Sequence, residues 1–275
     1  MGTEAFRFDG RRALVVGGAT GMGAATATIV QDLGAEVVIM DYARVDVAGA
    51  KGIAVDLRDE SSIDAAVAEC GGPVHALFSC AGVADGTPGI EKVNFIGHRH
   101  LIERMLENDF LPRGSAIAMI SSGAGLGWLS HLPLLTEYLA TPDFASAAAW
   151  IEAHPDKANY IWSKQAINAY VAQQAYPLLK RRIRINAIMP GPTDTPLARA
   201  NADVWLGFGA DYRRDTGIDA STPEEQAYPL VFLCSDAAQY VTGQALVTDA
   251  GYAASGITNS YPAAKAATDF LLGHS

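Results

Sequence analysis

Ala13-Leu14-Val15-Val16-Gly17-Gly18-Ala19-Thr20-Gly21-Met22-Gly23 decides the fold class of this 275-residue chain. Its first four residues are all apolar, which is typical of a parallel strand covered by helices on both faces. The glycine-rich loop that follows leads directly into an Ala-rich segment of helical spacing. A strand, a glycine loop and a helix in this order predict a βα unit of a parallel sheet.

The same alternation continues along the chain, where short apolar runs are separated by longer segments of helical period. The predicted strands are Arg12–Gly17, Glu36–Met40, Gly52–Asp56, Val74–Ser79, Ser115–Ile120, Arg182–Ala187 and Ala245–Thr248. The predicted helices are Gly21–Leu33, Ser61–Cys70, Ile90–Asn108, Lys157–Leu179 and Pro223–Cys234. With no repeat or linker in between, we expect one α/β domain, residues 1–275, with a Rossmann-type doubly wound parallel sheet.

The composition indicates a folded, acidic protein, since 49% of the residues are hydrophobic and 18% are charged. A formal net charge of −10 opposes binding to nucleic acid or to an anionic membrane surface. The scattered Cys70, Cys80 and Cys234, with no signal peptide or membrane-spanning stretch, predict a soluble cytoplasmic protein. We expect no metal site, because the histidines have no metal-ligand spacing; they are His75, His98, His100, His131, His154 and His274.

The glycine loop is also a candidate phosphate-binding site. Gly17, Gly21 and Gly23 let the backbone approach a pyrophosphate, which free N–H groups at the start of the next helix would bind. Asp41 follows the second predicted strand, where a carboxylate accepts hydrogen bonds from ribose hydroxyls and repels a 2′-phosphate. The alternatives are an ordinary glycine turn and a turn-initiating Asp. Together these features predict NAD as the cofactor, with Arg44 as the one residue that would weaken the preference over NADP.

Further motifs, taken in order, resemble those of the short-chain dehydrogenase/reductase family, and the resemblance covers nearly the whole chain. They are the glycine loop, Asp56-Leu57, Ser79-Cys80-Ala81-Gly82, Asn94, Ser121-Ser122, the YxxxK pair in Tyr160-Ile161-Trp162-Ser163-Lys164, and Pro190-Gly191-Pro192-Thr193-Asp194-Thr195. A YxxxK pair alone recurs by chance, but the ordered series is highly specific. The resemblance implies an NAD(P)-dependent enzyme that acts on CH–OH groups.

The resemblance implies a catalytic set of Asn94, Ser122, Tyr160 and Lys164. Oxidation of a secondary alcohol needs a base for the hydroxyl proton, and reduction needs the same group as an acid. Tyr160 and Lys164 share a helix face, and an ammonium near the phenol, together with the positive nicotinamide ring, favours the phenolate and lowers its pKa from about 10. By resemblance, Lys164 also binds the nicotinamide ribose, Ser122 hydrogen-bonds the substrate oxygen, and Asn94 holds a water that relays protons to Lys164.

The resemblance also assigns residues to cofactor binding. They are Gly17, Thr20, Gly21, Met22, Gly23, Asp41, Asp56, Leu57, Cys80, Ala81, Gly82, Tyr160, Lys164, Pro190, Gly191, Thr193 and Thr195. Simpler structural roles stay open for several of these positions and for the catalytic set. Ser122 would then cap a strand end, and Asn94 would be an ordinary polar helix residue. Thr193 and Thr195 would be turn residues only.

Three departures from the family pattern leave the catalytic groups in place. Val16 stands where the family has a Thr whose hydroxyl ties neighbouring strands. Ser79 and Cys80 replace two Asn, so other groups must make the hydrogen bonds of the first Asn. The segment Val247–Gly251 differs slightly from the usual VDGG ending.

The chain also carries a helical insertion at about residues 127–156, because Ser122 and Tyr160 are farther apart than in typical family members. A subset of the family, which includes bacterial 3α-hydroxysteroid dehydrogenase/carbonyl reductase and coniferyl-alcohol dehydrogenase, has a similar insertion. One helix is predicted near Leu132–Ala140, and a second with Thr141 as its cap and Pro142 as its first residue.

Two interpretations of the insertion remain open. Its apolar residues either wall a pocket for a bulky ring substrate, or they pack an oligomer interface or a small core of their own. They are Trp128, Leu132, Leu134, Leu135, Tyr138, Leu139, Phe144, Trp150 and Ile151. A C-terminal extension, residues 252–275, contains a predicted helix at Ala263–Leu272 that covers the pocket or a neighbouring subunit.

The leading functional hypothesis is an NAD-dependent oxidoreductase that interconverts a secondary alcohol and a ketone on a hydroxysteroid, terpenoid or alicyclic alcohol. The alternatives are an aryl or allylic alcohol dehydrogenase, a ketoreductase on an acyl or sugar substrate, and a non-catalytic dinucleotide sensor. Enoyl reduction is disfavoured, because that branch spaces its Tyr and Lys more widely. The only other partner we expect is a second copy of the chain, in a homodimer or homotetramer.

Overall fold

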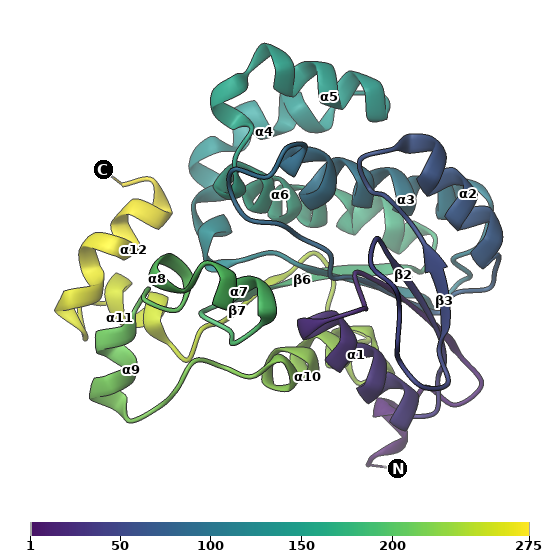
Figure 1. Cartoon of the computed structure of the whole chain (residues 1–275), viewed down its shortest axis with the longest axis horizontal. Coiled ribbons are helices and arrows are strands. Elements are labelled where there is room, and N and C mark those ends of the chain that lie inside the picture. The colour runs from purple at the N-terminus through teal and green to yellow at the C-terminus, as the bar shows by residue number, and fades with distance from the viewer. Residues whose placement is uncertain (1, 275) are drawn as a thin grey trace.

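A parallel sheet of seven strands forms the centre of the computed structural model, which describes residues 2–274 (Figure 1). The strand order is β3-β2-β1-β4-β5-β6-β7. The strands are β1 (Arg12–Val16), β2 (Glu36–Asp41), β3 (Lys51–Ala54), β4 (Ala76–Ser79), β5 (Ala116–Ile120), β6 (Arg184–Pro190) and β7 (Ala245–Thr248). All six neighbouring pairs are parallel, so every strand ends at the same edge of the sheet.

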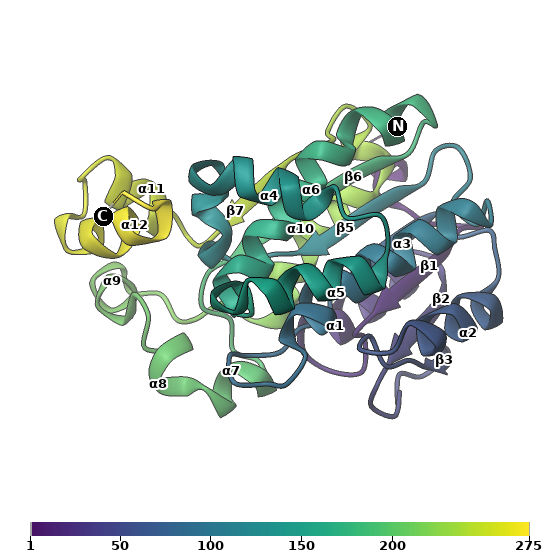
Figure 2. The same ribbon diagram turned by 90° about the horizontal axis from the view of Figure 1, so that it is seen from above.

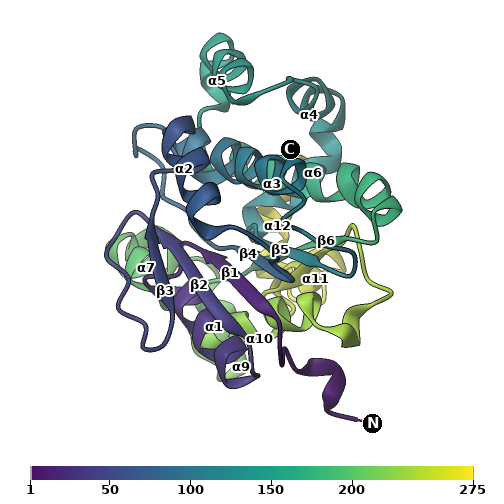
Figure 3. The ribbon, with the colours of Figure 1, turned by 90° about the vertical axis from the view of Figure 1, so that its right-hand side faces the viewer.

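Helices cover both faces of this sheet (Figure 3). One face carries α1 (Gly21–Asp32) and α10 (Pro223–Cys234), and the other carries α2 (Glu60–Cys70), α3 (Gly97–Glu107) and α6 (Tyr160–Lys180). The remaining helices are α4 (Leu132–Leu139), α5 (Phe144–Ala153), α7 (Pro196–Ala200), α8 (Ala202–Trp205), α9 (Ala210–Thr216), α11 (Tyr252–Ile257) and α12 (Lys265–Leu272). The expected Rossmann-type doubly wound sheet is therefore confirmed. Met1 and Ser275, the ends of the predicted domain, lie outside the described residues.

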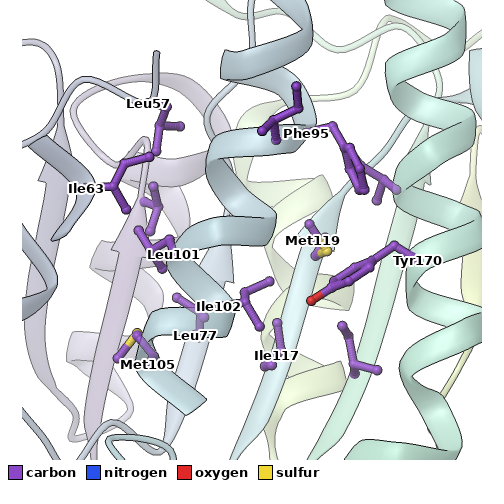
Figure 4. Close-up of a cluster of buried hydrophobic side chains, with 14 of the residues drawn as sticks. Leu57, Ile63, Leu77, Phe95, Leu101, Ile102, Met105, Ile117, Met119 and Tyr170 are labelled. Carbon is purple, nitrogen blue, oxygen red and sulfur yellow. The ribbon is translucent and has the colours of Figure 1, made fainter. Parts of the chain in front are cut away.

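Two buried clusters, one on each face of the sheet, explain the continuous apolar runs of the strands. The cluster beneath α2, α3 and α6 includes Leu77, Ile102, Ile117 and Tyr170, each at most 2% exposed (Figure 4). The cluster beneath α1 and α10 takes the alternate strand residues, such as Val15, which is fully buried. Because successive side chains of a strand point to opposite faces, a strand covered on both sides must be apolar throughout.

Several predicted element boundaries were wrong, each for a local reason. Strand β6 begins at Arg184, not at Arg182, because Arg182 has a left-handed backbone with φ 60°. Helix α6 begins at Tyr160, not at Lys157, because the Asn159 side chain accepts a hydrogen bond from the N–H of Trp162 at 2.8 Å and caps the helix.

The second helix of the insertion and the segment after β6 also differ from the prediction. Helix α5 is capped by Asp143, whose side chain accepts from the N–H of Ser146 at 2.7 Å, and not by Thr141. The sequence reading missed the short helices α7, α8, α9 and α11. The predicted helix 90–108 contains a π-helical turn, Lys92–Ile96, directly before α3, which the sequence pattern did not indicate.

The insertion forms an outer layer over α3 and α6, where α4 and α5 lie farthest from the sheet (Figures 1 and 3). The ring of Tyr138 is 1% exposed, and its centroid lies 5.6 Å from that of Phe95. Trp150 stacks on Trp162 of α6, with centroids 5.8 Å apart and planes 7° apart. The side chain of Arg99 in α3 also donates hydrogen bonds to the Thr141 hydroxyl and carbonyl. The insertion therefore packs most of its apolar residues against the main body, while Leu132 is 39% exposed.

The C-terminal helices α11 and α12 lie at the end of the molecule near α9 (Figure 2). Helix α12 packs against Gly123–His131, a 3-10 segment that follows β5, and the Ser130 hydroxyl donates to the Leu272 carbonyl at 2.8 Å. A Cβ on Gly127 would lie 2.5 Å from the Leu271 carbonyl oxygen, so the two segments are in close contact. Between residues 2 and 274, no helix combines the length and the apolar character needed to cross a membrane.

Candidate active site

A cleft of about 400 Å³ opens at the carboxyl edge of the sheet, between the glycine loop and the ends of β2 and β4. Gly17 has φ +83°, and a Cβ there would lie 2.3 Å from the nitrogen of Ala81. A Cβ on Gly23 would lie 2.0 Å from the Gly17 carbonyl oxygen. The backbone is thus packed too closely for side chains at these two positions. Thr20 precedes α1 without capping it through its side chain, so N–H groups of the first turn remain available to a ligand.

Most of the predicted cofactor-binding residues line this cleft. They are Gly17, Thr20, Gly21, Met22, Gly23, Asp41, Asp56, Leu57, Cys80, Ala81, Gly82 and Thr195. At the edge of the cleft, Asp41 accepts hydrogen bonds from the N–H groups of Ala19 and Ala43, both at 2.8 Å. Its carboxylate is therefore held beside the glycine loop, as a ribose-binding group requires, whereas Arg44 is not among the lining residues.

A second cavity, of about 330 Å³, adjoins the cleft and contains the predicted Ser122, Tyr160 and Lys164 together with Pro190, Gly191 and Thr193. Tyr160 is the first residue of α6, and Lys164 follows one turn later, with its ammonium nitrogen 5.3 Å from the centroid of the phenol ring. Ser122 lies just after the end of β5 and lines the same cavity as the Tyr160 phenol. We call this space the active-site cavity.

Comparisons with known proteins match this arrangement to a family. Residues 11–141 match the model described as short chain dehydrogenase, and residues 144–253 match one described as enoyl-(acyl carrier protein) reductase. The cis-4-hydroxycyclohexanecarboxylate dehydrogenase of Sinomonas cyclohexanicum is 34% identical over 262 residues, which cover 90% of this chain and 98% of that protein. The chain belongs to the short-chain dehydrogenase/reductase family.

Two further proteins, one of them a solved structure, are also similar to this short-chain dehydrogenase/reductase. The 3-alpha-hydroxysteroid dehydrogenase/carbonyl reductase of Comamonas testosteroni is 30% identical, over 86% of this chain and 95% of that protein. The solved 3-alpha-hydroxysteroid dehydrogenase from Pseudomonas sp. B-0831, complexed with NADH, has a TM-score of 0.72 at 25% identity, over 90% of this chain and 98% of that chain. The family predicted from the motifs is therefore confirmed, as is membership of a group of enzymes that act on CH–OH groups.

Burial favours the neutral forms of both Tyr160 and Lys164, the two residues of the YxxxK pair. Lys164 is 3% exposed, and burial lowers its pKa to about 8. Burial raises the pKa of Tyr160 to about 12, while the hydrogen bond from Ser122 acts in the opposite direction. The sequence predicts a lowered pKa for Tyr160 from Lys164 together with the nicotinamide ring, and in the chain without a cofactor desolvation of the phenol has the largest effect on that pKa.

Asn94 lies in the π-helical turn and connects the loop after β4 to α6. Its side-chain oxygen accepts from the N–H of Val83 at 2.8 Å, and its side-chain nitrogen donates to the Val83 carbonyl and to the Ser163 hydroxyl. Only one lone pair of its oxygen is left. A Cβ on Gly82 would lie 3.5 Å from that oxygen and 3.7 Å from the Lys164 nitrogen, so a small gap separates Asn94 from Lys164.

His98 binds the loop at the end of β4, in which Ser79 and Cys80 stand where the family has two Asn. The buried His98 ring hydrogen-bonds the Ala81 carbonyl through Nε2 at 3.0 Å, and burial lowers its pKa to about 4, which keeps it neutral. Ser79 itself is 2% exposed, and its hydroxyl has no hydrogen-bond partner within the described residues. The loop that carries Cys80 and Gly82 is thus held by His98 at Ala81 and by Asn94 at Val83.

The two threonines after β6 have structural partners. Thr193 donates to the Gly191 carbonyl at 3.0 Å and hydrogen-bonds Ser221, and Thr195 caps α7 by accepting from the N–H of Ala198. Both also line the active-site cavity, so the turn role and the ligand role are compatible.

The sequence reading missed most of the apolar wall of the active-site cavity. Trp205 of α8 lies against Tyr160, with ring centroids 5.0 Å apart, and Phe208, Tyr252 and Leu271 also belong to the wall. None of the nine apolar residues of the insertion lines this cavity, so the pocket interpretation of the insertion was wrong. The C-terminal helix α12 covers the cavity through Leu271. A usable signal existed, because Val204, Trp205 and Phe208 form an apolar group in a polar stretch soon after the Pro-Gly turn.

Proposed function

We propose that this protein is an NAD-dependent oxidoreductase that interconverts a secondary alcohol and a ketone on an apolar cyclic substrate, such as a hydroxysteroid, a terpenoid or an alicyclic alcohol. The observation that carries the proposal is one cavity in which the Ser122 hydroxyl and the Tyr160 phenol lie beside an apolar wall. Its volume of about 330 Å³ is that of a small-molecule site.

Each polar group of the cavity has a role in this reaction. During oxidation, the Tyr160 oxygen accepts the hydroxyl proton of the substrate, and during reduction it returns a proton to the carbonyl oxygen. Ser122 donates a hydrogen bond to the substrate oxygen, where negative charge develops. When bound, the nicotinamide dinucleotide accepts or delivers the hydride.

Lys164 and Asn94 help Tyr160 to lose and regain its proton. The Lys164 ammonium, one helical turn from the phenol, favours the phenolate whenever it is charged. The gap beside Gly82 lies between Lys164 and the free lone pair of Asn94, and we assign a water to it that relays protons toward solvent. These two residues therefore set how readily Tyr160 exchanges its proton.

The cyclic substrate class is supported by the relatives and by the cavity wall. The 34% identical relative is named for a hydroxycyclohexane ring, and the 30% identical one for a steroid alcohol. The wall offers the broad faces of Trp205, Phe208 and Tyr252 to a flat or puckered ring. Those faces also favour a second candidate, an aryl alcohol dehydrogenase.

The preference for NAD rests on Asp41. Its two carboxylate oxygens are fixed by the N–H groups of Ala19 and Ala43, so the charge does not swing away from the cleft. A 2′-phosphate brought to this carboxylate would meet like charge. The solved 3-alpha-hydroxysteroid dehydrogenase relative holds NADH, which agrees with this preference.

A screen of initial rates tests the proposal. The wild-type enzyme is incubated with NAD or with NADP and with steroid, alicyclic and aryl secondary alcohols, and absorbance of the reduced cofactor is followed. We expect turnover of ring alcohols with NAD at a higher kcat/KM than with NADP. Turnover with NADP alone would contradict the role of Asp41, and turnover of aryl alcohols alone would favour the second candidate.

We also propose a cytoplasmic homodimer or homotetramer. Its cysteines Cys70, Cys80 and Cys234 are free, which suits a reducing compartment. The edge strand β7 exposes Leu246 by 43% and Val247 by 37%, which suits burial against a second copy. Light scattering during gel filtration at micromolar concentration is expected to give two or four times the chain mass, and a monomer would contradict this.

A further inference from the structure

The active-site cavity contains few charged side chains. Among its described lining residues, Lys164 is the only cation, and the anions are Asp85 and Asp249. Lys164 is almost fully buried and donates a hydrogen bond to the Ile120 carbonyl at 2.9 Å. It is therefore committed to the catalytic end of the cavity and is not free to pair with a charged group elsewhere on a substrate.

An arginine in the cavity that shares the apolar wall already has hydrogen-bond partners. Arg213 lines a neighbouring cavity, and its guanidinium donates to the carbonyl oxygens of Phe208 and Leu206. The rings of Phe208 and Tyr252, with centroids 5.1 Å apart, belong to both cavities and form part of the wall between them. No described lining residue of the active-site cavity thus offers a cation to an anionic substituent.

Two carboxylates are fixed beside the cavity by backbone N–H groups. Asp85, on the turn after β4, accepts from the N–H of Tyr160 at 2.7 Å. Asp249, directly after β7, accepts from the N–H of Gly251 at 2.9 Å and from that of Ala253 at 2.8 Å. Because each carboxylate holds a piece of backbone that lines the cavity, its negative charge stays at the cavity and does not swing into solvent.

Resting on the proposed function, we infer that the substrate is an uncharged ring alcohol or ketone, and that Asp85 is a specificity-determining residue that disfavours ring compounds with a carboxylate. The relative named for cis-4-hydroxycyclohexanecarboxylate shares 34% of its residues with this chain, but the cavity described here holds two acids and no spare base. An anionic substituent entering it would lose hydration and would face like charge without a partner.

The size of the effect follows from Coulomb's law. A carboxylate at about 8 Å from one fixed negative charge, at an effective dielectric constant of about 30, is disfavoured about tenfold in binding. Asp85 is exposed at the mouth of the cavity, so added salt will screen part of this repulsion. The discrimination should therefore be strongest at low ionic strength.

Two matched substrate pairs test the inference in the wild-type enzyme with saturating NAD. One is cis-4-hydroxycyclohexanecarboxylate against its primary carboxamide, and the other is a 3-hydroxysteroid with a side-chain carboxylate against its methyl ester. We expect kcat/KM for the uncharged member to be about tenfold higher or more at low salt, and the ratio to shrink at high salt. Equal or higher kcat/KM for the carboxylates at low salt would overturn the inference.

The variants Asp85→Asn and Asp32→Asn assign the effect to one residue. Asn keeps an oxygen to accept from the N–H of Tyr160 but removes the charge. Asp32 makes the matched control, because it is exposed at the end of α1, at the opposite edge of the sheet, and its substitution changes the net charge equally. We expect Asp85→Asn to reduce the ratio several-fold and Asp32→Asn to leave it unchanged.

The remaining outcomes are distinct. If Asp85→Asn leaves the ratio unchanged, the assignment to Asp85 is overturned. If Asp85→Asn does not fold, the salt dependence of the wild-type ratio still decides whether charge is the cause, because a ratio set by size alone does not change with salt. If the enzyme oxidises no ring alcohol of either charge, the proposed function itself fails.

Discussion

The side-chain ammonium of Lys164 donates a hydrogen bond to the main-chain carbonyl of Ile120 at 2.9 Å, and the Ser121 hydroxyl donates to the main-chain carbonyl of Lys164 at 3.0 Å. The end of β5 thus binds both the side chain and the backbone of Lys164. This places a cation in a site where it is 3% exposed and where one carbonyl is its only described hydrogen-bond partner. The position of Lys164 is therefore fixed at the cost of desolvating its charge.

The buried Lys164 predicts a pH-dependent stability. The pKa of its side chain falls from 10.5 to about 8 on folding, so between these values the unfolded chain binds more protons than the folded one. The contribution of Lys164 to the free energy of unfolding therefore rises with pH across this window. Urea unfolding of the cofactor-free enzyme should show wild type gaining about 3 kcal/mol relative to Lys164→Met as the pH rises from about 7.5 to 10.5. If the free energy of unfolding changes with pH in the same way for both proteins, the lowered pKa of the buried lysine is contradicted.

The buried position of Tyr138 predicts that the insertion contributes to stability and not to substrate specificity. Its ring is 1% exposed and packs against Phe95, Trp150 and Trp162. Tyr138→Ala should lower the free energy of unfolding by about 3–5 kcal/mol, because it leaves a cavity among these rings. Tyr176→Ala, at a site 73% exposed, is the control and should change it by less than about 0.5 kcal/mol. A changed ranking of substrates by Tyr138→Ala, assayed below its melting temperature, would place the insertion on the substrate path after all.

For Trp205 we predict an effect on substrate binding and almost none on stability. Its ring lies 5.0 Å from that of Tyr160 between centroids and forms part of the cavity wall, but α8 lies outside the two buried clusters. Trp205→Ala should raise KM for a bulky ring substrate about tenfold, since it removes apolar contact area, and should leave the melting temperature nearly unchanged. The KM for NAD is the internal control. An unchanged substrate KM would show that the ring does not contact the substrate.

Asp41 predicts a switch in cofactor selectivity. Replacing it with Ser removes the negative charge while leaving a short polar side chain beside Ala19 and Ala43. The ratio of kcat/KM for NAD to that for NADP should fall at least about tenfold in Asp41→Ser, because the repulsion of a 2′-phosphate is lost. The check is a pair of steady-state titrations with the two cofactors. A ratio that stays at its wild-type value would mean that another group selects the cofactor.

Much of the fold was readable from the sequence because its signals are local. Ala13–Val16 is apolar on both faces, and a glycine loop and a helix follow at once, so the first βα unit allowed one interpretation. The errors came from single residues. Arg182 adopts a left-handed backbone that ends the turn before β6, and Asn159 delays the start of α6 by capping it. Asn is a preferred N-cap residue, so Asn159 did mark the start of α6 and the prediction passed over it, whereas Arg182 carries no such signal.

Part of the candidate active site could be predicted from the sequence because of the topology of the sheet. Ser122 and Tyr160 come from the end of β5 and the start of α6, and the parallel sheet brings strand ends to one edge. The apolar wall of the active-site cavity could not be predicted. The spacing of apolar residues shows that a helix buries one face, but it does not show what covers that face. Tyr138 and Trp205 both have apolar residues beside them in the sequence, yet the first packs on Phe95 and Trp162 and the second on the Tyr160 phenol.

The sequence predicts a lowered pKa for Tyr160 from Lys164 together with the positive nicotinamide ring, and the chain without a cofactor supplies only the first of these. The sequence shows a lysine one turn from the phenol, but it does not show how much water the fold removes from both groups. Burial outweighs the hydrogen bond from Ser122 and raises the pKa of Tyr160 to about 12. A base at neutral pH therefore needs more positive charge beside it than this chain supplies, and a bound oxidised nicotinamide would add such charge.

The most direct test of the account compares wild type with Tyr160→Phe, which removes one oxygen and keeps the ring against Trp205. With NAD and the best ring alcohol of the screen, kcat should fall by about 10² to 10⁴-fold, while the Kd for NADH measured by fluorescence stays within about twofold of wild type. If Tyr160→Phe turns over at the wild-type rate, Tyr160 is not the acid–base group, and the proposed mechanism is wrong.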